Sequence, residues 1–277
     1  MKELLSPVIL TVIIAFAAAV LLTIAAVFLA VKKDETAEKV RECLPGANCG
    51  GCGFAGCDDY AEQIAKNPDL PLTLCAPGGA GAANAIAEVL GRSAGEVIPK
   101  VAVVKCSGYN DVAKTAMEYQ GISSCASAKE LCGGPNACKY GCLGFGDCAS
   151  VCPVGAIEIC NGVAKIDRTK CTGCGACSKK CPKGVIELVP AASRVYVGCS
   201  SNDFGKTQIA NCTAGCLGCR LCEKTCKFDA IHVENNVAYI DPEKCKNCGM
   251  CAKVCPKHII HVVPKPVVKP AQTEEKA

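Results

Sequence analysis

Large aromatic residues are scarce in this sequence, which has no Trp, 6 Phe and 6 Tyr among 277 residues. A chain so poor in rings cannot fill a large aromatic core, and small modules of that kind depend on bound metal for their folding free energy. The chain also lacks a large net charge, because its 30 basic and 26 acidic residues leave only +4. No basic run is interleaved with aromatic residues, so nucleic acid is excluded as a partner.

A dinucleotide-binding fingerprint is absent as well. The glycine-rich residues 78–81 and 144–146 do not stand between a strand and a helix, as such a fingerprint requires. We therefore expect no flavin or nicotinamide in this chain, which cannot complete a nicotinamide reaction alone. The histidines lie in or beside apolar, strand-like stretches and are interpreted as structural: His232, His258 and His261.

Cysteine is what the sequence has in excess, at 27 of 277 residues. Such a content indicates a disulfide scaffold, zinc sites or iron–sulfur clusters. Disulfide scaffolds are usually short secreted chains with scattered cysteines, whereas most cysteines here stand in tight runs with two-residue gaps. Because thiolate ligands stay unpaired in a reducing compartment, we expect the bulk of the chain to lie on the cytoplasmic side.

One long apolar run lies near the start of the chain, at residues 8–31. At about 1.5 Å per residue, a helix of that length exceeds the roughly 30 Å hydrocarbon core of a bilayer. A cleaved signal peptide would have a shorter apolar region of about 7–15 residues. The sequence thus predicts a single-pass anchor over residues 1–33 in the cell (inner) membrane, in contact with the lipid bilayer. Lys32 and Lys33 on its flank favour a cytoplasmic C-terminus.

The strongest motif is the spacing of bacterial ferredoxins, which occurs twice: Cys171-x2-Cys174-x2-Cys177-x3-Cys181-Pro182 and Cys245-x2-Cys248-x2-Cys251-x3-Cys255-Pro256. In this pattern three cysteines of one loop bind one cluster, and the fourth binds the neighbouring cluster. A zinc ribbon instead uses two separated CxxC pairs. The spacing therefore predicts 4Fe–4S clusters rather than zinc.

A partner motif precedes each ferredoxin motif: Cys138-x3-Cys142-x5-Cys148-x3-Cys152, in which both inner gaps are widened, and Cys216-x2-Cys219-x2-Cys222-x3-Cys226. Cross-ligation between the members of each pair then predicts four clusters. The first takes Cys138, Cys142, Cys148 and Cys181; the second takes Cys152, Cys171, Cys174 and Cys177; the third takes Cys216, Cys219, Cys222 and Cys255; the fourth takes Cys226, Cys245, Cys248 and Cys251.

A different cysteine group stands nearer the start of the chain: Cys49-x2-Cys52-x4-Cys57-x17-Cys75. Its many glycines let the backbone fold tightly around a cofactor and offer amide groups to its sulfurs. Cys57 directly precedes a predicted helix (DDYAEQIAK), and a helix N-terminus favours a thiolate. We interpret this group as the ligands of a fifth 4Fe–4S cluster; the alternative is a small zinc knuckle.

The second half of the chain contains an internal repeat. Residues 104–111 resemble residues 197–203, and the segments 156–171 and 230–245 match each other. Each of the two segments indicates a strand, an Asn-Gly or Asn-Asn turn, a second strand and a cluster loop. The chain therefore carries two copies of one unit.

Some cysteines lie outside all these motifs. The repeat places four of them at equivalent positions in pairs: Cys106 with Cys125, and Cys199 with Cys212. These two half-sites predict a sixth cluster between the copies. The alternative is that they are inert, buried cysteines that act as small hydrophobic residues. Three others have no repeat partner and are interpreted as non-ligands: Cys43, Cys132 and Cys160.

The order of these features resembles the B subunit of the Rnf complex, the ion-translocating ferredoxin:NAD oxidoreductase of bacterial membranes. The resemblance covers residues 1–261 and is most specific in the hydrophobic start and in the ANCGGCGFAGC segment at residues 47–57. The chain is similar to the longer form of the subunit, which has two ferredoxin pairs. The resemblance implies an electron-transfer subunit of a translocase that relays electrons from soluble ferredoxin to other membrane and flavin-bearing subunits. Several lysines lie near the cluster loops: Lys179, Lys180, Lys183, Lys224 and Lys227. They are interpreted either as a surface that attracts an acidic ferredoxin or as an ordinary solvated surface.

We expect an α+β fold made of small units. Their predicted order is a transmembrane anchor at 1–33, an N-terminal 4Fe–4S module with a connector at 34–100, ferredoxin-like units at 101–196 and 197–261, and a disordered Pro/Lys-rich tail at 262–277. Two other functions stay open. A polyferredoxin subunit of a membrane hydrogenase or formate dehydrogenase would not need the Cys49–Cys75 motif, and a cluster-based redox or iron sensor would need an output domain.

Overall fold

The computed structural model describes residues 12–24 and 34–264. Residues 12–24 form a helix with exposed apolar side chains such as Phe16 and Leu21. Within the described ranges, no helix is long and apolar enough to cross a membrane. The transmembrane helix in the predicted fold is therefore corrected; residues 8–11 and 25–31 of the predicted run lie outside the described residues.

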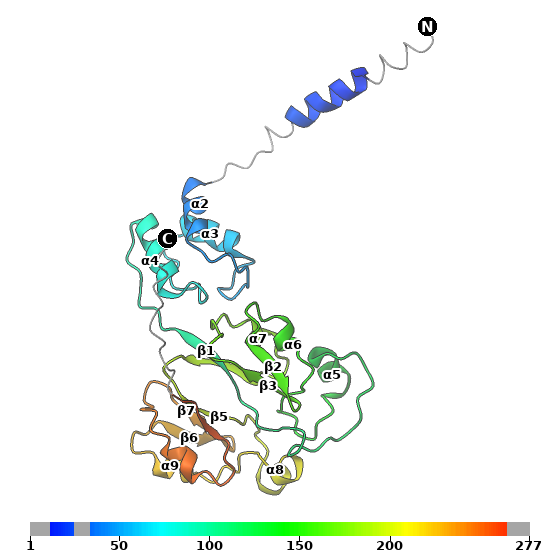
Figure 1. Ribbon diagram of the computed structural model, residues 1–277, viewed down its shortest axis with the longest axis vertical. Helices are drawn as coiled ribbons and strands as arrows, with labels where there is room; N and C mark the ends of the chain where they lie inside the picture. The colour runs from blue at the N-terminus through cyan, green and yellow to red at the C-terminus, as the bar shows by residue number, and fades with distance from the viewer. Residues whose placement is uncertain (1–11, 25–33, 265–277) are drawn as a thin grey trace, which may run out of the picture.

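A helical module lies at one end of the main body (Figure 1) and contains α2 (Glu35–Glu42), α3 (Cys57–Lys66) and α4 (Gly79–Leu90). Its core is formed by apolar side chains that face one another, and Tyr60, Ile64 and Ile86 are almost fully buried there. Full burial of each such side chain stabilises the module by about 1.5–3 kcal/mol. The helices predicted at 58–66 and 82–90 are confirmed, and each begins slightly earlier than the sequence indicated.

The two repeats follow along the chain. The first contains β1 (Lys100–Val104), α5 (Cys125–Cys132), α6 (Asp147–Ser150), β2 (Ile157–Cys160), β3 (Val163–Ile166), α7 (Ala176–Lys180) and β4 (Ile186–Pro190). The second contains β5 (Val195–Val197), α8 (Gly205–Asn211), α9 (Leu221–Thr225), β6 (Ile231–Glu234), β7 (Val237–Ile240), α10 (Met250–Val254) and β8 (Ile260–Val262). The predicted tail lies outside the described residues from position 265 onward.

Both repeats use the same strand pairing. The inner strands form antiparallel hairpins, β2 with β3 and β6 with β7. The outer strands close each repeat, because β1 pairs with β4 and β5 pairs with β8, again antiparallel. Each repeat is therefore a pair of two-stranded sheets with short helices, and the cysteine loops lie between the strands (Figure 1).

The hairpin turns explain why the inner strands form. Asn161 and Gly162 in the first hairpin have φ of 47° and 79°, and Asn235 and Asn236 in the second have 46° and 65°. Positive φ at both central residues defines the type I′ turn, whose twist matches that of paired strands and which Asn and Gly tolerate best. The two predicted hairpins are confirmed.

The hydrophobic cores of the repeats are small, and cysteines are part of them. In the first repeat Val163, Val185 and Ile186 are buried together with Cys142, Cys148 and Cys177. The second repeat has the same composition, with Ile231 and Ile259 beside buried cysteines. Thiols take the place of larger apolar side chains in these cores. The stability of each repeat therefore depends on the ligand that its thiols bind.

Candidate metal centres

The N-terminal site brings together the four cysteines predicted for it: Cys49, Cys52, Cys57 and Cys75. Burial raises the pKa of the Cys75 thiol, and the nearby sulfurs of Cys57, Cys52 and Cys49 raise it further. Cys57 is the first residue of α3, so its sulfur lies at a helix N-terminus. The backbone N–H of Cys57 donates to Asn48 Oδ1 at 2.8 Å, which fixes the turn that leads into the helix.

The second site is a pocket beside β1 and α7. It is lined by the four cysteines predicted for the second cluster: Cys152, Cys171, Cys174 and Cys177. Backbone amides point at these sulfurs, because Ala102 N–H donates to Cys171 Sγ at 3.5 Å and Ala156 N–H donates to Cys152 Sγ at 3.3 Å. Burial raises the pKa of Cys177 to about 11, and the sulfurs of Cys171 and Cys174 add to the rise.

Two pockets of the second repeat also hold one predicted ligand set each. The third site is lined by Cys216, Cys219, Cys222 and Cys255. The fourth site is lined by Cys226, Cys245, Cys248 and Cys251. In both, the fourth cysteine comes from the other motif, as cross-ligation requires. Burial raises the pKa of the Cys222 and Cys251 thiols to about 11, whereas Cys219 and Cys248 are exposed at the pocket rims.

The first site differs from the predicted set by one residue. Burial raises the pKa of Cys148 to about 12, and the sulfurs that raise it further are those of Cys142, Cys125 and Cys181. Burial likewise raises the pKa of Cys142, and Cys125 and Cys181 again contribute. The structure thus brings Cys125, not Cys138, to the other three cysteines of this site.

Asp147 holds Cys125 in that position. Its carboxylate accepts hydrogen bonds from the backbone N–H of Cys125 at 2.9 Å, from that of Ala126 at 3.0 Å and from the Ser124 hydroxyl at 2.9 Å. Although burial opposes it, these bonds lower the pKa of the Asp147 carboxyl. Because Asp147 directly precedes Cys148, the contact fastens the start of α5 to the first site.

Cys138 lies elsewhere, in a pocket between the two repeats. The cysteines that line this pocket are Cys106, Cys138, Cys142, Cys199 and Cys212. Cys125 therefore lies near the cysteines predicted for the first site, and Cys138 lies near those predicted for the sixth.

A sequence signal for this placement exists and was missed. Cys138-x3-Cys142 and Cys212-x3-Cys216 have the same spacing, and a glycine precedes the second cysteine in both, Gly141 and Gly215. The equivalent of Cys212 is therefore Cys138. The widened Cys142-x5-Cys148 gap then lacks a counterpart of Cys219, and Cys125 supplies that thiol from a separate loop.

The cysteines interpreted as non-ligands lie apart from the pockets. The Cys43 thiol donates to the Lys39 carbonyl oxygen at 3.3 Å, and the Cys132 thiol donates to that of Ala128 at 3.2 Å. Cys160 ends β2 and lines none of the cysteine pockets described above.

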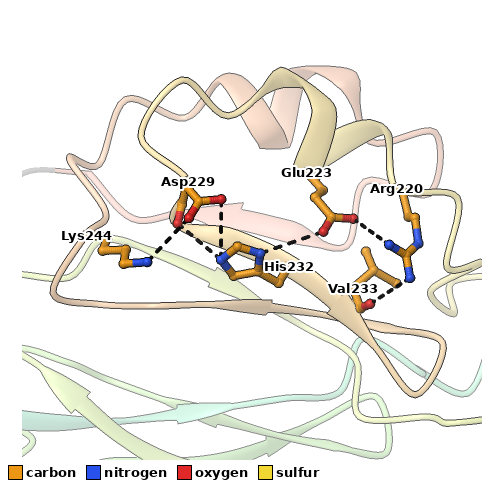
Figure 2. A network of polar contacts seen from close by, with 6 residues as sticks. All are labelled: Arg220, Glu223, Asp229, His232, Val233 and Lys244. Carbon is orange, nitrogen blue, oxygen red and sulfur yellow. Dashed lines mark hydrogen bonds and ion pairs between the residues drawn. The ribbon is translucent and has the colours of Figure 1, made fainter.

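The rings of His232 and His261 make polar contacts with groups other than cysteine. Figure 2 shows the His232 ring between two carboxylates, with Nδ1 3.7 Å from Glu223 and Nε2 3.8 Å from Asp229. Arg220 and Lys244 extend this surface network at either end (Figure 2). Such exposed pairs stabilise a fold by about 0–1 kcal/mol each. The network ties α9 to the β6–β7 hairpin beside the third site.

Two of the lysines near the cluster loops have internal partners. Lys179 Nζ donates to the Gly50 carbonyl oxygen at 2.9 Å. Lys183 Nζ donates to the carbonyl oxygens of Gly133 at 2.6 Å and Lys139 at 2.7 Å, and burial lowers its pKa. Lys224 and Lys227 are exposed beside the third and fourth sites, so a soluble partner can reach them.

The N-terminal module rests directly on the second site. Besides the Lys179–Gly50 bond, Gly51 packs against the backbone carbonyl of Cys174 so closely that a Cβ would overlap it. Cys49 is also among the sulfurs that raise the pKa of Cys174, after burial. The N-terminal and second sites are therefore neighbours.

The donor sets fit iron–sulfur clusters. Among the described residues, no three Cys, His or carboxylate side chains close around a point as one metal ion requires; the thiols surround pockets instead. Four such pockets are lined by cysteines from more than one motif or loop. Buried thiolates are unfavourable unless a cation compensates them, and metal ligation provides that compensation. Amides aimed at the sulfurs are the hydrogen bonds that tune cluster potentials.

Family models match three segments of the chain. The FeS model, described as an Fe-S cluster, matches residues 44–77, which span the N-terminal site. A 4Fe-4S binding domain matches residues 164–187 and 238–261, which contain the two ferredoxin motifs. The chain therefore carries iron–sulfur binding domains.

Relatives match most of the chain. The B subunit of the Na(+)-translocating ferredoxin:NAD(+) oxidoreductase complex of Acetobacterium woodii is 43% identical over 226 residues, 81% of this chain and 68% of that protein. Its proton-translocating counterpart from Clostridium ljungdahlii is 44% identical over 217 residues, 78% of this chain and 76% of that protein. The B subunit of the ion-translocating oxidoreductase complex of Methanosarcina acetivorans is 41% identical over 231 residues, 83% of this chain and 87% of that protein.

Proposed function

Because the chain belongs to the family of B subunits of ion-translocating ferredoxin:NAD(+) oxidoreductase (Rnf) complexes, we propose that it exchanges electrons with soluble ferredoxin and passes them to its partner subunits. It is an electron-transfer subunit of such a complex, and the other subunits are its partners. The hydrogenase and sensor alternatives are set aside, because these relatives span about four-fifths of the chain. The observation that carries the proposal is the set of thiol-lined pockets around both ferredoxin motifs.

The residues of this chain hold and shield cofactors rather than make bonds. We assign 4Fe–4S clusters to the N-terminal, first, second, third and fourth sites, with Cys125 replacing Cys138 in the first. A bound cluster supplies a one-electron carrier at each site. The protein orients the thiolates, limits their contact with water by burying or partly burying all of them except Cys219 and Cys248, and directs backbone N–H groups at several of the sulfurs.

We place the chain at the inner face of the cell membrane, within its complex. Ion translocation needs a membrane, and thiolate-held clusters need the reducing cytoplasmic side. Movement of the ion belongs to other subunits. The coupling ion differs between relatives, since one is named for sodium and another for protons.

The second repeat offers the most accessible sites for ferredoxin. Cys219 and Cys248 are exposed at the rims of the third and fourth sites. Arg220 and Lys257 line the third pocket and Lys246 lines the fourth, so the rims carry positive charge. Positive rims attract an acidic protein and accelerate its association.

The test is anaerobic mixing of reduced ferredoxin with the oxidised, iron-loaded full chain. We expect rapid loss of visible absorbance on the chain's clusters, at a rate that falls as ionic strength rises. Replacing Lys224 and Lys246 together with Glu should slow the reaction by about tenfold or more at low salt, because steering is lost.

The matched control carries the same charge change elsewhere, at the exposed Lys66 on α3 and Lys129 on α5, and should retain the wild-type rate. No electron exchange with the wild-type chain would refute ferredoxin as a partner. Equal slowing in both variants would refute the docking surface.

A further inference from the structure

The pocket between the repeats has the chemistry of a cluster site. Its wall contains four cysteines that no other site uses, two from each repeat, together with Cys142 of the first site and small residues such as Gly108 and Gly141. A methyl group on Gly141 would lie 3.7 Å from Cys138 Sγ and 3.8 Å from Cys106 Sγ, so these two sulfurs face the same space. A methyl group on Gly108 would lie 3.4 Å from Cys106 Sγ and 3.5 Å from Cys212 Sγ, so these two sulfurs also face that space.

The fourth cysteine reaches the same space from the second repeat. Burial raises the pKa of Cys199 to about 11, and the sulfurs of Cys216 and Cys138 add to the rise. Burial also raises the pKa of the Cys212 thiol, and the sulfur of Cys138 raises it further. Cys138 of the first repeat is thus close to both cysteines of the second.

The pocket matches the assigned sites in its hydrogen bonds to sulfur. The backbone N–H of Gly108 donates to Cys106 Sγ at 3.4 Å.

We propose that the two repeats share a 4Fe–4S cluster, bound by Cys106 and Cys138 of the first repeat and by Cys199 and Cys212 of the second. We call this the seam site. It rests on the proposed function only in taking iron–sulfur clusters to be what the thiols bind. Each repeat supplies two equivalent thiolates, so neither repeat can complete the site alone.

The seam site joins the cluster sites of the two repeats. The backbone N–H of Cys142, a ligand of the first site, donates to Cys106 Sγ at 3.3 Å. In the second repeat the N–H of Cys216, a ligand of the third site, donates to Cys199 Sγ at 3.3 Å. The sites then form one row: N-terminal, second, first, seam, third and fourth. Without the seam site this row is interrupted between the repeats.

The repeats also meet through backbone contacts around the seam site. Lys114 N–H donates to the Asn211 carbonyl oxygen, and Thr213 N–H donates to that of Val112, both at 3.0 Å. His261 Nε2 lies 2.8 Å from Ser107 Oγ, which links β8 to the residue after Cys106. These contacts hold the two half-sites in register in the folded chain.

The test measures iron, acid-labile sulfide and the EPR spectrum of the reduced, anaerobically purified full chain. Cys106→Ala combined with Cys199→Ala should remove about four iron atoms from a wild-type content of about 24. The control, Cys132→Ala with Cys160→Ala, removes the same number of thiols and should remove no iron.

A third substitution then separates the two ligand assignments. Added to the Cys106/Cys199 variant, Cys138→Ala should cost no further iron, because its cluster is already lost. Added to the same variant, Cys125→Ala should disrupt the first site and lower iron again or leave a 3Fe–4S signal. The opposite pattern would overturn the ligand set in favour of the pairing that the sequence predicted.

If the combined variants do not yield folded protein, single substitutions give the same comparison with less disruption of the fold. Cys138→Ala and Cys212→Ala should alter the same EPR component, and Cys125→Ala a different one. Wild-type iron near 20, with equal iron in the seam variant and its control, would overturn the seam site while leaving the proposed function intact. A wild-type chain without iron and sulfide would instead refute the proposed function.

Discussion

Removing iron from the full chain is expected to unfold residues 100–262 as a whole. Each repeat consists of two-stranded sheets, which are marginal on their own, around cores that include several cysteines. Structural metal sites contribute on the order of 10 kcal/mol each to folding, more than a small domain retains in total. The measurement is far-UV circular dichroism and amide hydrogen exchange before and after treatment with a chelator and an oxidant.

The helical module serves as an internal control in that experiment. Tyr60, Ile64 and Ile86 are almost fully buried there, and α2, α3 and α4 contact one another directly. Amides of α3 and α4 should therefore keep part of their protection when those of β1–β8 lose theirs. An iron-free chain whose strands keep the exchange protection of the loaded protein would contradict the account.

Replacing Gly173 with Ala is expected to empty the second site. Gly173 lies between Cys171 and Cys174 with φ of +68°, and an added Cβ would overlap the backbone carbonyl oxygen of Lys100 in β1. Left-handed backbone costs a non-glycine residue about 1–2 kcal/mol, and overpacking against a backbone atom adds about 1–3 kcal/mol. We expect the loss of about four iron atoms per chain and a lower melting temperature.

Gly155→Ala is the matched variant. Gly155 also has a positive φ, +59°, and lies near the same site, but an added Cβ meets no atom within 4 Å. It should lower stability by only about 1–2 kcal/mol and keep the full iron content. Equal iron in the two variants would show that the packing of the cluster loop on β1 does not govern the second site.

The local parts of this structure were predictable because their signals are local. The Asn-Gly and Asn-Asn turns specify the two hairpins through the φ angles they tolerate. The helix from Cys57 follows from its amphipathic pattern, and the ferredoxin spacing groups three thiols on one short loop. In each case the residues that decide the outcome lie within a few positions of one another.

The placement of Cys125 and Cys138 was not predicted because it depends on contacts distant in sequence. Cys125 reaches the first site through hydrogen bonds from its loop to Asp147, 22 residues further along the chain. The transmembrane helix predicted from the apolar run at 8–31 is corrected for a different reason: no helix within residues 12–24 and 34–264 is long and apolar enough to cross a membrane. The reach of a loop does not follow from cysteine spacing alone.

The central claim is that the cysteines of this chain bind 4Fe–4S clusters, and the most direct test is the metal content of the full chain purified without oxygen. Iron and acid-labile sulfide should be equimolar, at about 24 atoms of each per chain, with negligible zinc and with Mössbauer parameters of cubane clusters. Zinc in stoichiometric amounts with negligible sulfide would contradict the account.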